Sequence, residues 1–426
     1  PMKKISLAAI VFFFTGCFVS AQKINHITLD SCYLLAIEHN PTAQQSKLYQ
    51  SVWELQESAL NTHKLPQASL GGQVSWQSDV TSLPISLPNV QIPSLDKDSY
   101  KLYLDVNQLI WNGGIVQKQK ELEKAGLLIS LQTVEAENYR MKETVNQVYF
   151  SILLLQENEK LLKLSMSEIQ SRLGKIRAGV ANGTLLPSNA EVLEAEIIKT
   201  EQSITEVNHN KAAAIFRLSE ITGIILDEQT EFEQPQFKDL PELNTRLRPE
   251  YQLLELQQHK LTAQQKITSL KVMPRISAFA SLGYGKPGLN MLSNQFDTYA
   301  MVGARASWTL WNWNEHKKEN SIIGIQKEII ETQKENFERN QRILLNNQHE
   351  EIVKNETLVA ADFRIVKLRE SVVKSSGAQL EQGTITSSEF LTEQNALTQV
   401  RINQTLHSIQ LQYARLNYLS TMGLLK

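Results

Sequence analysis

The sequence predicts a mostly α-helical chain with a small β part, built from two copies of one long unit. Three observations carry this prediction. Short segments recur in the same order in the two halves of the 426-residue chain. Four short stretches alternate apolar and polar residues, as the strands of a two-faced sheet do. Two further stretches, each of about 65 residues, keep the apolar spacing of coiled-coil helices.

The repeated segments lie at a nearly constant separation. Four pairs of positions carry them, the first two pairs 208 residues apart and the last two 200 apart: Pro41 and Pro249, Pro66 and Pro274, Trp111 and Trp311, Gly183 and Gly383. Matches in one order at almost constant spacing indicate a tandem duplication. We therefore expect a first copy over 22–223, a linker over 224–248 and a second copy over 249–426.

Each copy should open with a helix and two strands. In the first copy the helix is expected from about Pro41 to Lys64, since the N–H that proline lacks is not needed at the first helical position. The strands are expected at about 67–80 and 99–111, and in the second copy at about 275–284 and 299–311. Their apolar face carries Ala68, Leu70, Gly72, Val74, Trp76, Tyr100, Leu102, Leu104, Val106, Ile110, Ile276, Ala278, Ala280, Leu282, Tyr284, Ala300, Val302, Ala304, Ala306, Trp308 and Leu310.

A long helical hairpin should complete each copy, over about 115–222 and 315–423, with its turn at a Gly-Thr pair. The first long helix has a seam with an average period of 3.5, which predicts coiled-coil packing. This seam is Leu131, Val134, Asn138, Met141, Val145, Val148, Ile152, Leu155, Glu159, Leu162, Met166, Ile169, Leu173 and Ile176. A thinner heptad stripe in the second is Ile323, Ile330, Phe337, Leu344, Glu351, Leu358, Ile365 and Val372.

The strands have the length that a tilted membrane-spanning strand needs. Lipid offers no hydrogen bonds to a sheet edge, and transmembrane barrels begin at about eight strands, so four strands require copies of the chain to close. The tryptophans that follow the strands suit an interfacial girdle: Trp111, Trp308, Trp311 and Trp313. The alternative is a soluble antiparallel sheet packed on a helical bundle.

The whole order of elements resembles a known family. A helix, a strand after "LP", a Pro-rich loop, a strand ending in "WNGG", a long helix, a Gly-Thr turn and a return helix occur twice. This order is similar to that of the TolC family of outer-membrane efflux proteins. The resemblance implies a homotrimer with a 12-stranded β-barrel continuous with a periplasmic α-helical barrel. It also implies a location in the outer membrane of a bacterial cell.

The resemblance implies a function and partners as well. The function would be a passive exit duct in a tripartite efflux or type I secretion system, which conducts small molecules or proteins. The partners would be a periplasmic adaptor (membrane fusion protein), an inner-membrane pump of the RND, ABC or MFS type, and outer-membrane lipid. A periplasmic coiled-coil scaffold or adaptor without a channel is the alternative, although four amphipathic strands favour the duct.

The resemblance further places two groups of functional residues at the hairpin turns. The residues of the two turns that would meet the adaptor are Gly183, Thr184 and Leu185 in the first hairpin and Gly383, Thr384 and Ile385 in the second. Glu389, its expected counterpart Glu191, and Thr392 would surround the periplasmic aperture. Three symmetry-related Glu389 carboxylates would repel one another, which would raise their pKa. The alternative is that both glutamates are ordinary early-helix residues. Leu380 and Ile385 replace a Tyr and an Arg that latch the hairpins of some relatives.

The first residues predict a signal peptide over 1–21, with cleavage after Ala21. "FTGC" at 14–17 leaves open a lipoprotein, in which Cys17 would be acylated. A net charge of −2 gives no reason to expect nucleic-acid binding. The sequence contains no H-E-x-x-H, C-x-x-C, G-x-S-x-G or P-loop motif, so we expect no enzyme activity, metal or cofactor.

Overall fold

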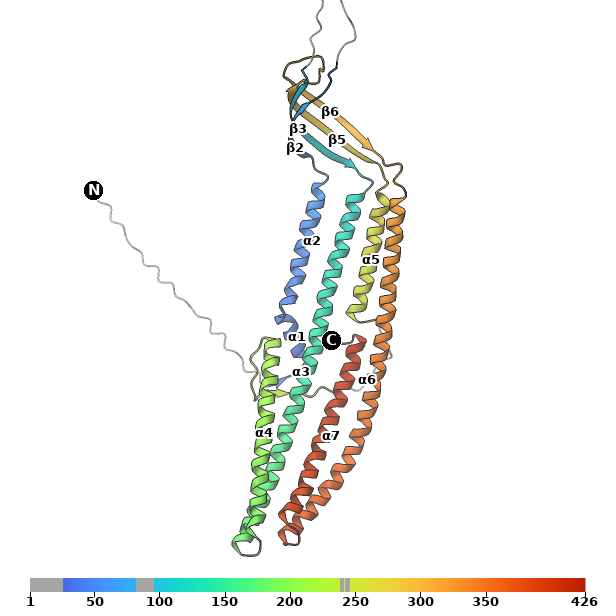
Figure 1. The fold of residues 1–426 in the computed structure, drawn as a ribbon. Coiled ribbons are helices and arrows are strands. Elements are labelled where there is room, and N and C mark those ends of the chain that lie inside the picture. The colour runs from blue at the N-terminus through green and yellow to red at the C-terminus, as the bar shows by residue number, and fades with distance from the viewer. Residues whose placement is uncertain (1–25, 82–95, 238–240, 242–245, 426) are drawn as a thin grey trace, which may run out of the picture. The chain divides into compact units, whose positions relative to one another are not determined.

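The computed structural model of the chain describes residues 26–81, 96–237, 241 and 246–425 (Figure 1). The expected signal peptide, Cys17 and most of the Pro-rich loop lie outside these residues. The described residues divide into two compact units, one formed by those within 26–39, 142–237 and 353–413 and the other by those within 40–141, 241–352 and 414–425. We call them the hairpin unit and the sheet unit, and each is described by itself.

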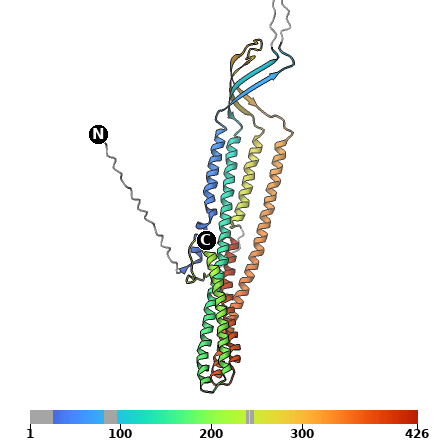
Figure 2. The same ribbon diagram turned by 60° about the vertical axis from the view of Figure 1, so that its left-hand side comes forward.

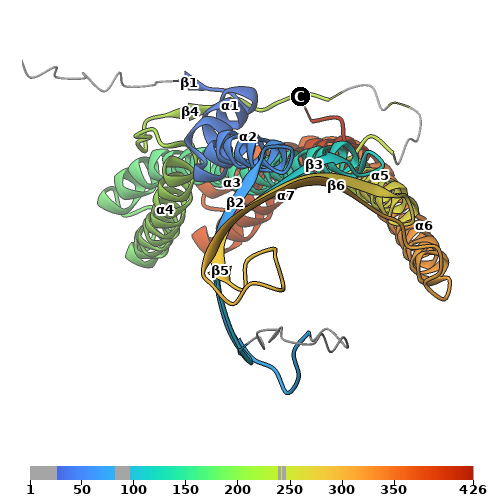
Figure 3. The same ribbon diagram turned by 90° about the horizontal axis from the view of Figure 1, so that it is seen from above.

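The sheet unit contains a four-stranded antiparallel sheet in the order β2-β3-β5-β6, which follows a curved path in Figure 3. Its strands are β2 (Gln67–Trp76), β3 (Asp98–Trp111), β5 (Arg275–Lys286) and β6 (Asp297–Ser307). A 3₁₀ turn, η1 (Pro41–Gln44), and two helices, α2 (Gln45–Thr62) and α5 (Pro249–Leu270), precede the two strand pairs. The predicted helix, strand, strand order is thus present in both copies.

Two strands end earlier than the sequence predicts. We expected β2 to reach about residue 80 and β6 to include Trp308 and Trp311, but they end at Trp76 and Ser307. The reason is pairing: Trp76 lies opposite the first residue of β3, and Ser307 lies opposite the first residue of β5. Beyond Trp76, one more backbone hydrogen bond, from the N–H of Gln77 to the carbonyl of Lys97 at 2.9 Å, follows the strand pair, and the described residues after Ser307 pair with no strand.

The strand register places the predicted apolar residues on one face. Leu70, Leu104, Leu282 and Ala300 lie side by side in one row of paired residues. This face is open: the exposed fraction is 74% at Leu70 and 83% at Val302. A sheet in water buries its apolar face on a core, whereas the described residues place no core against this face.

Ile110 is an exception to the predicted apolar face. A β-bulge between Leu109 and Trp111 leaves Ile110 without a partner in β5, and Trp111 pairs with Ile276 instead. A bulge adds one residue to one strand and so changes which side chains share a face. Trp111, rather than Ile110, therefore continues the row of apolar residues.

Four long helices carry the duplication most clearly. They are α3 (Ile115–Ala181), α4 (Pro187–Thr222), α6 (Glu315–Glu381) and α7 (Ser387–Met422). α3 and α6 each have 67 residues, and α4 and α7 each have 36. Every boundary of these helices in the second copy therefore lies 200 residues after its counterpart in the first. Figure 2 shows the turns of both hairpins at the same end of the hairpin unit. Among the described residues, no helix has the length and apolarity needed to cross a membrane.

The seam predicted on α3 is confirmed, because none of its fourteen residues is exposed. The stripe predicted on α6 is wrong beyond its first part: Leu344, Ile365 and Val372 are exposed. Between Ile323 and Ile352 the buried positions repeat every 11 residues, as the spacing of Ile323, Lys334 and Leu345 illustrates. An 11-residue repeat corresponds to 3.67 residues per turn, so the buried line leaves the heptad positions.

The hairpin unit also contains three elements that the sequence analysis did not predict. They are α1 (Leu29–His39) and the parallel two-residue strands β1 (His26–Ile27) and β4 (Glu231–Phe232). The hydroxyl of Tyr149 on α3 lies 2.9 Å from the carbonyl of Ile27 and 2.8 Å from that of Glu233. Part of the expected linker over 224–248 is thus an ordered strand that is held against α3.

Candidate functional site at the hairpin ends

The two hairpin turns have the same backbone structure. Gly183 and Gly383 adopt φ values of 71° and 72°, a left-handed conformation that favours glycine. The next residue, Thr184 or Thr384, donates its backbone N–H to a carbonyl in the preceding helix at 2.9 and 3.0 Å, and its hydroxyl donates to the same carbonyl at 2.9 Å. Both turns are exposed, so they are available to a partner.

An apolar cluster drawn from all four long helices lies next to the turns. Its buried members are Ile169, Leu173, Ile176, Ala190, Leu193, Ile197, Leu380, Phe390 and Leu391. Leu380 is fully buried in it, and Leu185 and Ile385 pack against it from the two turns. Leu380 and Ile385, which replace the latch residues of some relatives, therefore join the two hairpins by apolar packing.

A hydrogen bond also connects the two hairpins. The backbone N–H of Ser387, the first residue of α7, donates to Oδ1 of Asn189 in the first turn of α4 at 3.0 Å. The first N–H groups of a helix have no partner within the helix, so Asn189 supplies a cap from the neighbouring hairpin. Ser387 is fully buried, which makes an unpaired N–H at this position costly.

Glu389 forms a capping box with Thr386. Thr386 donates its backbone N–H and its hydroxyl to Oε2 of Glu389 at 2.7 and 3.0 Å. The backbone N–H of Glu389 donates in turn to the Thr386 hydroxyl at 3.3 Å. This is the Thr-x-x-Glu form of a helix N-terminus. The backbone and side-chain hydrogen bonds from Thr386 hold the pKa of Glu389 below its usual value in the single chain.

Glu191 is not the structural counterpart of Glu389. Because the helices match at a separation of 200 residues, Glu389 corresponds to Asn189, and Glu191 corresponds to the buried Leu391. Our pairing of the two glutamates was displaced by two residues. Glu191 is exposed on α4, and Thr392 is exposed on α7, where its hydroxyl donates to the Ser388 carbonyl at 3.0 Å.

Charged pairs that the sequence analysis did not single out join the hairpins near the turns. Glu381 at the end of α6 accepts from Lys175 of α3 at 2.8 Å and also pairs with Arg172. The hydrogen bond from Lys175 lowers the pKa of Glu381. Arg401 of α7 lies 3.1 Å from Glu168 and 2.9 Å from Glu370. A cavity of about 530 Å³ is lined by several of these side chains.

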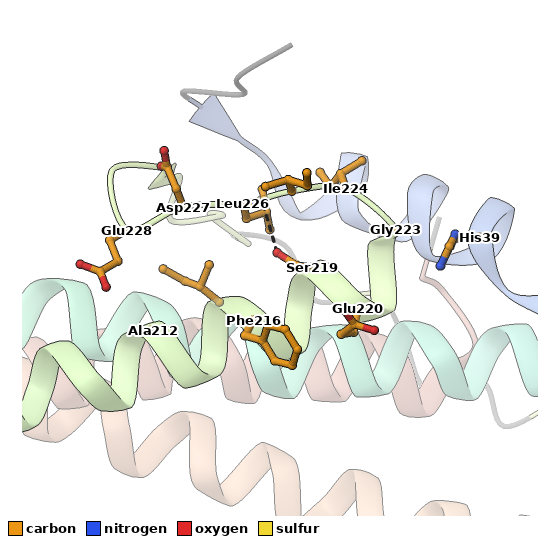
Figure 4. Close-up of a pocket in the computed structure, with 12 residues that line it drawn as sticks. His39, Ala212, Phe216, Ser219, Glu220, Gly223, Ile224, Leu226, Asp227 and Glu228 are labelled. Carbon is orange, nitrogen blue, oxygen red and sulfur yellow. Dashed lines mark hydrogen bonds between the residues drawn. The ribbon is translucent and has the colours of Figure 1, made fainter. Parts of the chain in front are cut away.

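A second cavity of about 580 Å³ lies where α1, the end of α4 and the loop after it meet (Figure 4). Its lining is largely apolar, with Phe216 and Ile224 among the contributors. The Leu226 N–H donates to the Ser219 hydroxyl at 3.1 Å and fixes the loop. Among the described residues, no group of three or more His, Cys, Asp or Glu side chains could hold a metal ion.

Comparison with solved structures finds outer-membrane proteins. CusC, a protein that forms a transmembrane channel, is 15% identical, with 93% of this chain and 92% of that chain covered and a TM-score of 0.71. The outer-membrane channel OprN is 13% identical, with 93% and 89% covered and a TM-score of 0.69. The Neisseria gonorrhoeae MtrE outer-membrane channel is 15% identical, with 93% and 89% covered and a TM-score of 0.66. Comparison by sequence finds no matching family model and no matching curated protein. The chain has the fold of these channels, as the duplicated motifs predict.

Proposed function

We propose that this chain, which has the fold of outer-membrane channels, is the outer-membrane exit duct of an export system. In this proposal three copies place their sheets side by side in the outer membrane and close a 12-stranded barrel. The helical hairpins extend into the periplasm. The duct conducts passively whatever an inner-membrane pump delivers through a periplasmic adaptor.

The observation that carries the proposal is the exposed apolar face of the sheet. Val74 and Val302 are exposed by 75% and 83%, and Leu282 by 57%. Such a face is unfavourable in water but is stable against lipid hydrocarbon, where apolar residues face outward and polar residues face the barrel interior. Since lipid cannot satisfy an open sheet edge, the outer strands β2 and β6 also need partners from other copies.

The hairpin turns are the proposed contact with the adaptor. They are exposed, they share one backbone structure, and apolar packing and the Asn189 cap hold them together. Near them we propose the periplasmic aperture, with Glu389 of three copies around it. The capping box fixes the Glu389 carboxylate at the start of α7. In the proposed aperture this carboxylate would therefore occupy a fixed position.

The alternative of a periplasmic scaffold without a channel gives no role to the exposed apolar strands. Reconstitution separates the two functions. The purified protein should contain three chains by light scattering corrected for bound detergent, and it should produce conductance steps in a planar lipid bilayer. A folded monomer that stays in the aqueous phase without detergent would rule out the duct.

A further inference from the structure

The polar face of the sheet carries charges whose arrangement changes along the strands. The register places five charged residues on this face: Lys101, Asp105, Arg275, Asp297 and Arg305. At the end far from the helices, Lys101 and Asp297 lie in one row of paired residues, separated by Gly285. Opposite charges therefore offset one another there, and Asp105 in the middle is the only other acidic residue on this face of the described strands.

At the end next to the helices, both charges are positive. Arg275 is the first residue of β5, the strand that follows α5, and Arg305 lies near the end of β6, the strand that precedes α6. Arg305 pairs with Ser277, and Arg275 pairs with Ser307, so the two arginines occupy adjacent rows of the polar face. Arg305 lies four residues beyond Met301, which shares a row with Asp105. This separation is about 13 Å along the strand.

Neither arginine is neutralised within the described part of the chain. Their side chains are exposed and form no ion pair with any described acidic residue. Arg305 is nevertheless positioned, because its guanidinium lies over the ring of Phe279 at 5.2 Å from the ring centroid. Phe279 in turn covers Gly303, where an added Cβ would lie 2.8 Å from the ring. An unpaired cation is therefore held against an aromatic ring on the polar face.

We infer that Arg275 and Arg305 form an anion-selecting ring where the strands join the helices, so that the duct favours solutes bearing carboxylate or phosphate groups. This inference rests on the proposed function, since closure of three chains brings six guanidinium groups to two adjacent levels of the channel. Rings of arginine or lysine select for anions, and guanidinium groups bind carboxylates and phosphates in a planar, two-point geometry.

The test is the reversal potential of single channels in a planar bilayer under a potassium chloride gradient. The double variant Arg275→Gln, Arg305→Gln should shift the reversal potential toward that of potassium relative to the unmodified protein. The variant Arg275→Lys, Arg305→Lys keeps the charges and should leave the potential unchanged. A matched control is Lys286→Gln, which removes a cation from the opposite, apolar face of the same sheet and should also cause no shift.

The outcomes separate this inference from the proposed function. Channels that open in the double glutamine variant with an unchanged reversal potential overturn the arginine ring but leave the duct intact. An unmodified protein that forms no channels overturns the duct itself. If the double variant does not assemble, Arg275→Gln and Arg305→Gln alone each remove three charges per trimer. Each should shift the potential in the same direction by a smaller amount, and the absence of both shifts also overturns the ring.

Discussion

Asn189 of one hairpin caps the helix of the other: its side-chain oxygen accepts the backbone N–H of Ser387 at 3.0 Å. Replacing Asn189 with Ala should lower the stability of the first turn of α7 by about 0.5–2 kcal/mol, as for other lost caps. Hydrogen–deuterium exchange should report faster exchange there. Asn189→Asp keeps an acceptor and serves as the control. Exchange in Asn189→Ala as slow as in the unmodified protein would mean that the cap contributes no stability.

The second prediction concerns the protonation state of Glu389. Its pKa is low in the single chain because of its hydrogen bonds to Thr386, whereas repulsion among three carboxylates would raise it. If the capping box prevails, cation selectivity due to Glu389 should persist as the pH falls to about 4.5, the ordinary glutamate value. Thr386→Ala removes the hydroxyl and should move the loss of selectivity to higher pH. Bilayer recordings over a pH series measure this.

The Glu389→Gln variant provides the matching control. It should shift the reversal potential away from that of potassium at every pH at which the Glu389 carboxylate is ionised, because the amide carries no charge. Unchanged selectivity in Glu389→Gln would exclude Glu389 from the aperture, although the duct would stand. Loss of selectivity well above the ordinary glutamate pKa in the unmodified protein would show that repulsion prevails over the capping box.

The third prediction concerns the two faces of the sheet. Val302→Arg or Leu104→Arg places a cation on the apolar face and should cost about 2–4 kcal/mol if the site is near the bilayer midplane. Ser75→Arg changes the polar face and should be tolerated. Ser307 is a less suitable control, because it lies opposite Arg275. The yield of assembled trimers after detergent extraction measures the difference, and equal yields would mean that the assignment of the faces is wrong.

The fourth prediction concerns Glu159, the charged residue in the mostly apolar seam of α3. Lys211 of α4 and Lys163 both pair with it, and the Glu159 and Lys211 side chains are only 12% and 10% exposed. Lys211→Met leaves Lys163 as the remaining partner, so we expect a loss of about 1–3 kcal/mol in local stability by hydrogen exchange. The double variant Lys211→Met, Glu159→Leu should recover much of that loss.

The same pair predicts a dependence on pH. Burial raises the pKa of Glu159, but the hydrogen bonds from Lys163 and Lys211 outweigh burial and lower it overall. A carboxyl group with a lowered folded-state pKa stabilises the fold above its unfolded pKa, and this stability is lost as the pH falls through the folded value. Local exchange in the first hairpin should therefore accelerate on acidification. This acceleration should be absent from the double variant.

The fifth prediction concerns the turns. Open space surrounds Gly183, so Gly183→Asn, which tolerates a positive φ, should preserve both the turn and export. Gly183→Glu adds a bulky charge at the proposed adaptor contact and should abolish export while trimers still form. Export assays in cells, paired with trimer yield, test this. Export that continues normally in Gly183→Glu would exclude this turn from the adaptor contact.

The sequence predicted the elements of this fold where apolar spacing marks burial, as along α3. It failed along α6, because buried positions there include the polar residues Lys334, Gln341 and Asn355, which apolar spacing does not reveal. The strands β1 and β4 have two residues each, which is too short for any periodicity.

At the hairpin ends, the Gly-Thr turns were found because glycine is needed for a positive φ. The Thr-x-x-Glu motif at 386–389 was also present in the sequence, but we did not recognise it because we paired Glu389 with Glu191. The cap from Asn189 joins residues 198 positions apart. No local pattern predicts such a contact, since it depends on how the hairpins pack.

The helices of the two copies have equal lengths, and the contacts between the two hairpins require these lengths to stay equal. One residue inserted into α3 would advance everything beyond it by about 1.5 Å and rotate it by about 100°. Asn189 would then no longer meet the Ser387 N–H, and the turns would end at different levels. A residue can be gained or lost in one hairpin only if the other hairpin changes with it. Paired insertions and deletions of this kind would preserve the constant separation of 200 residues that both hairpins show.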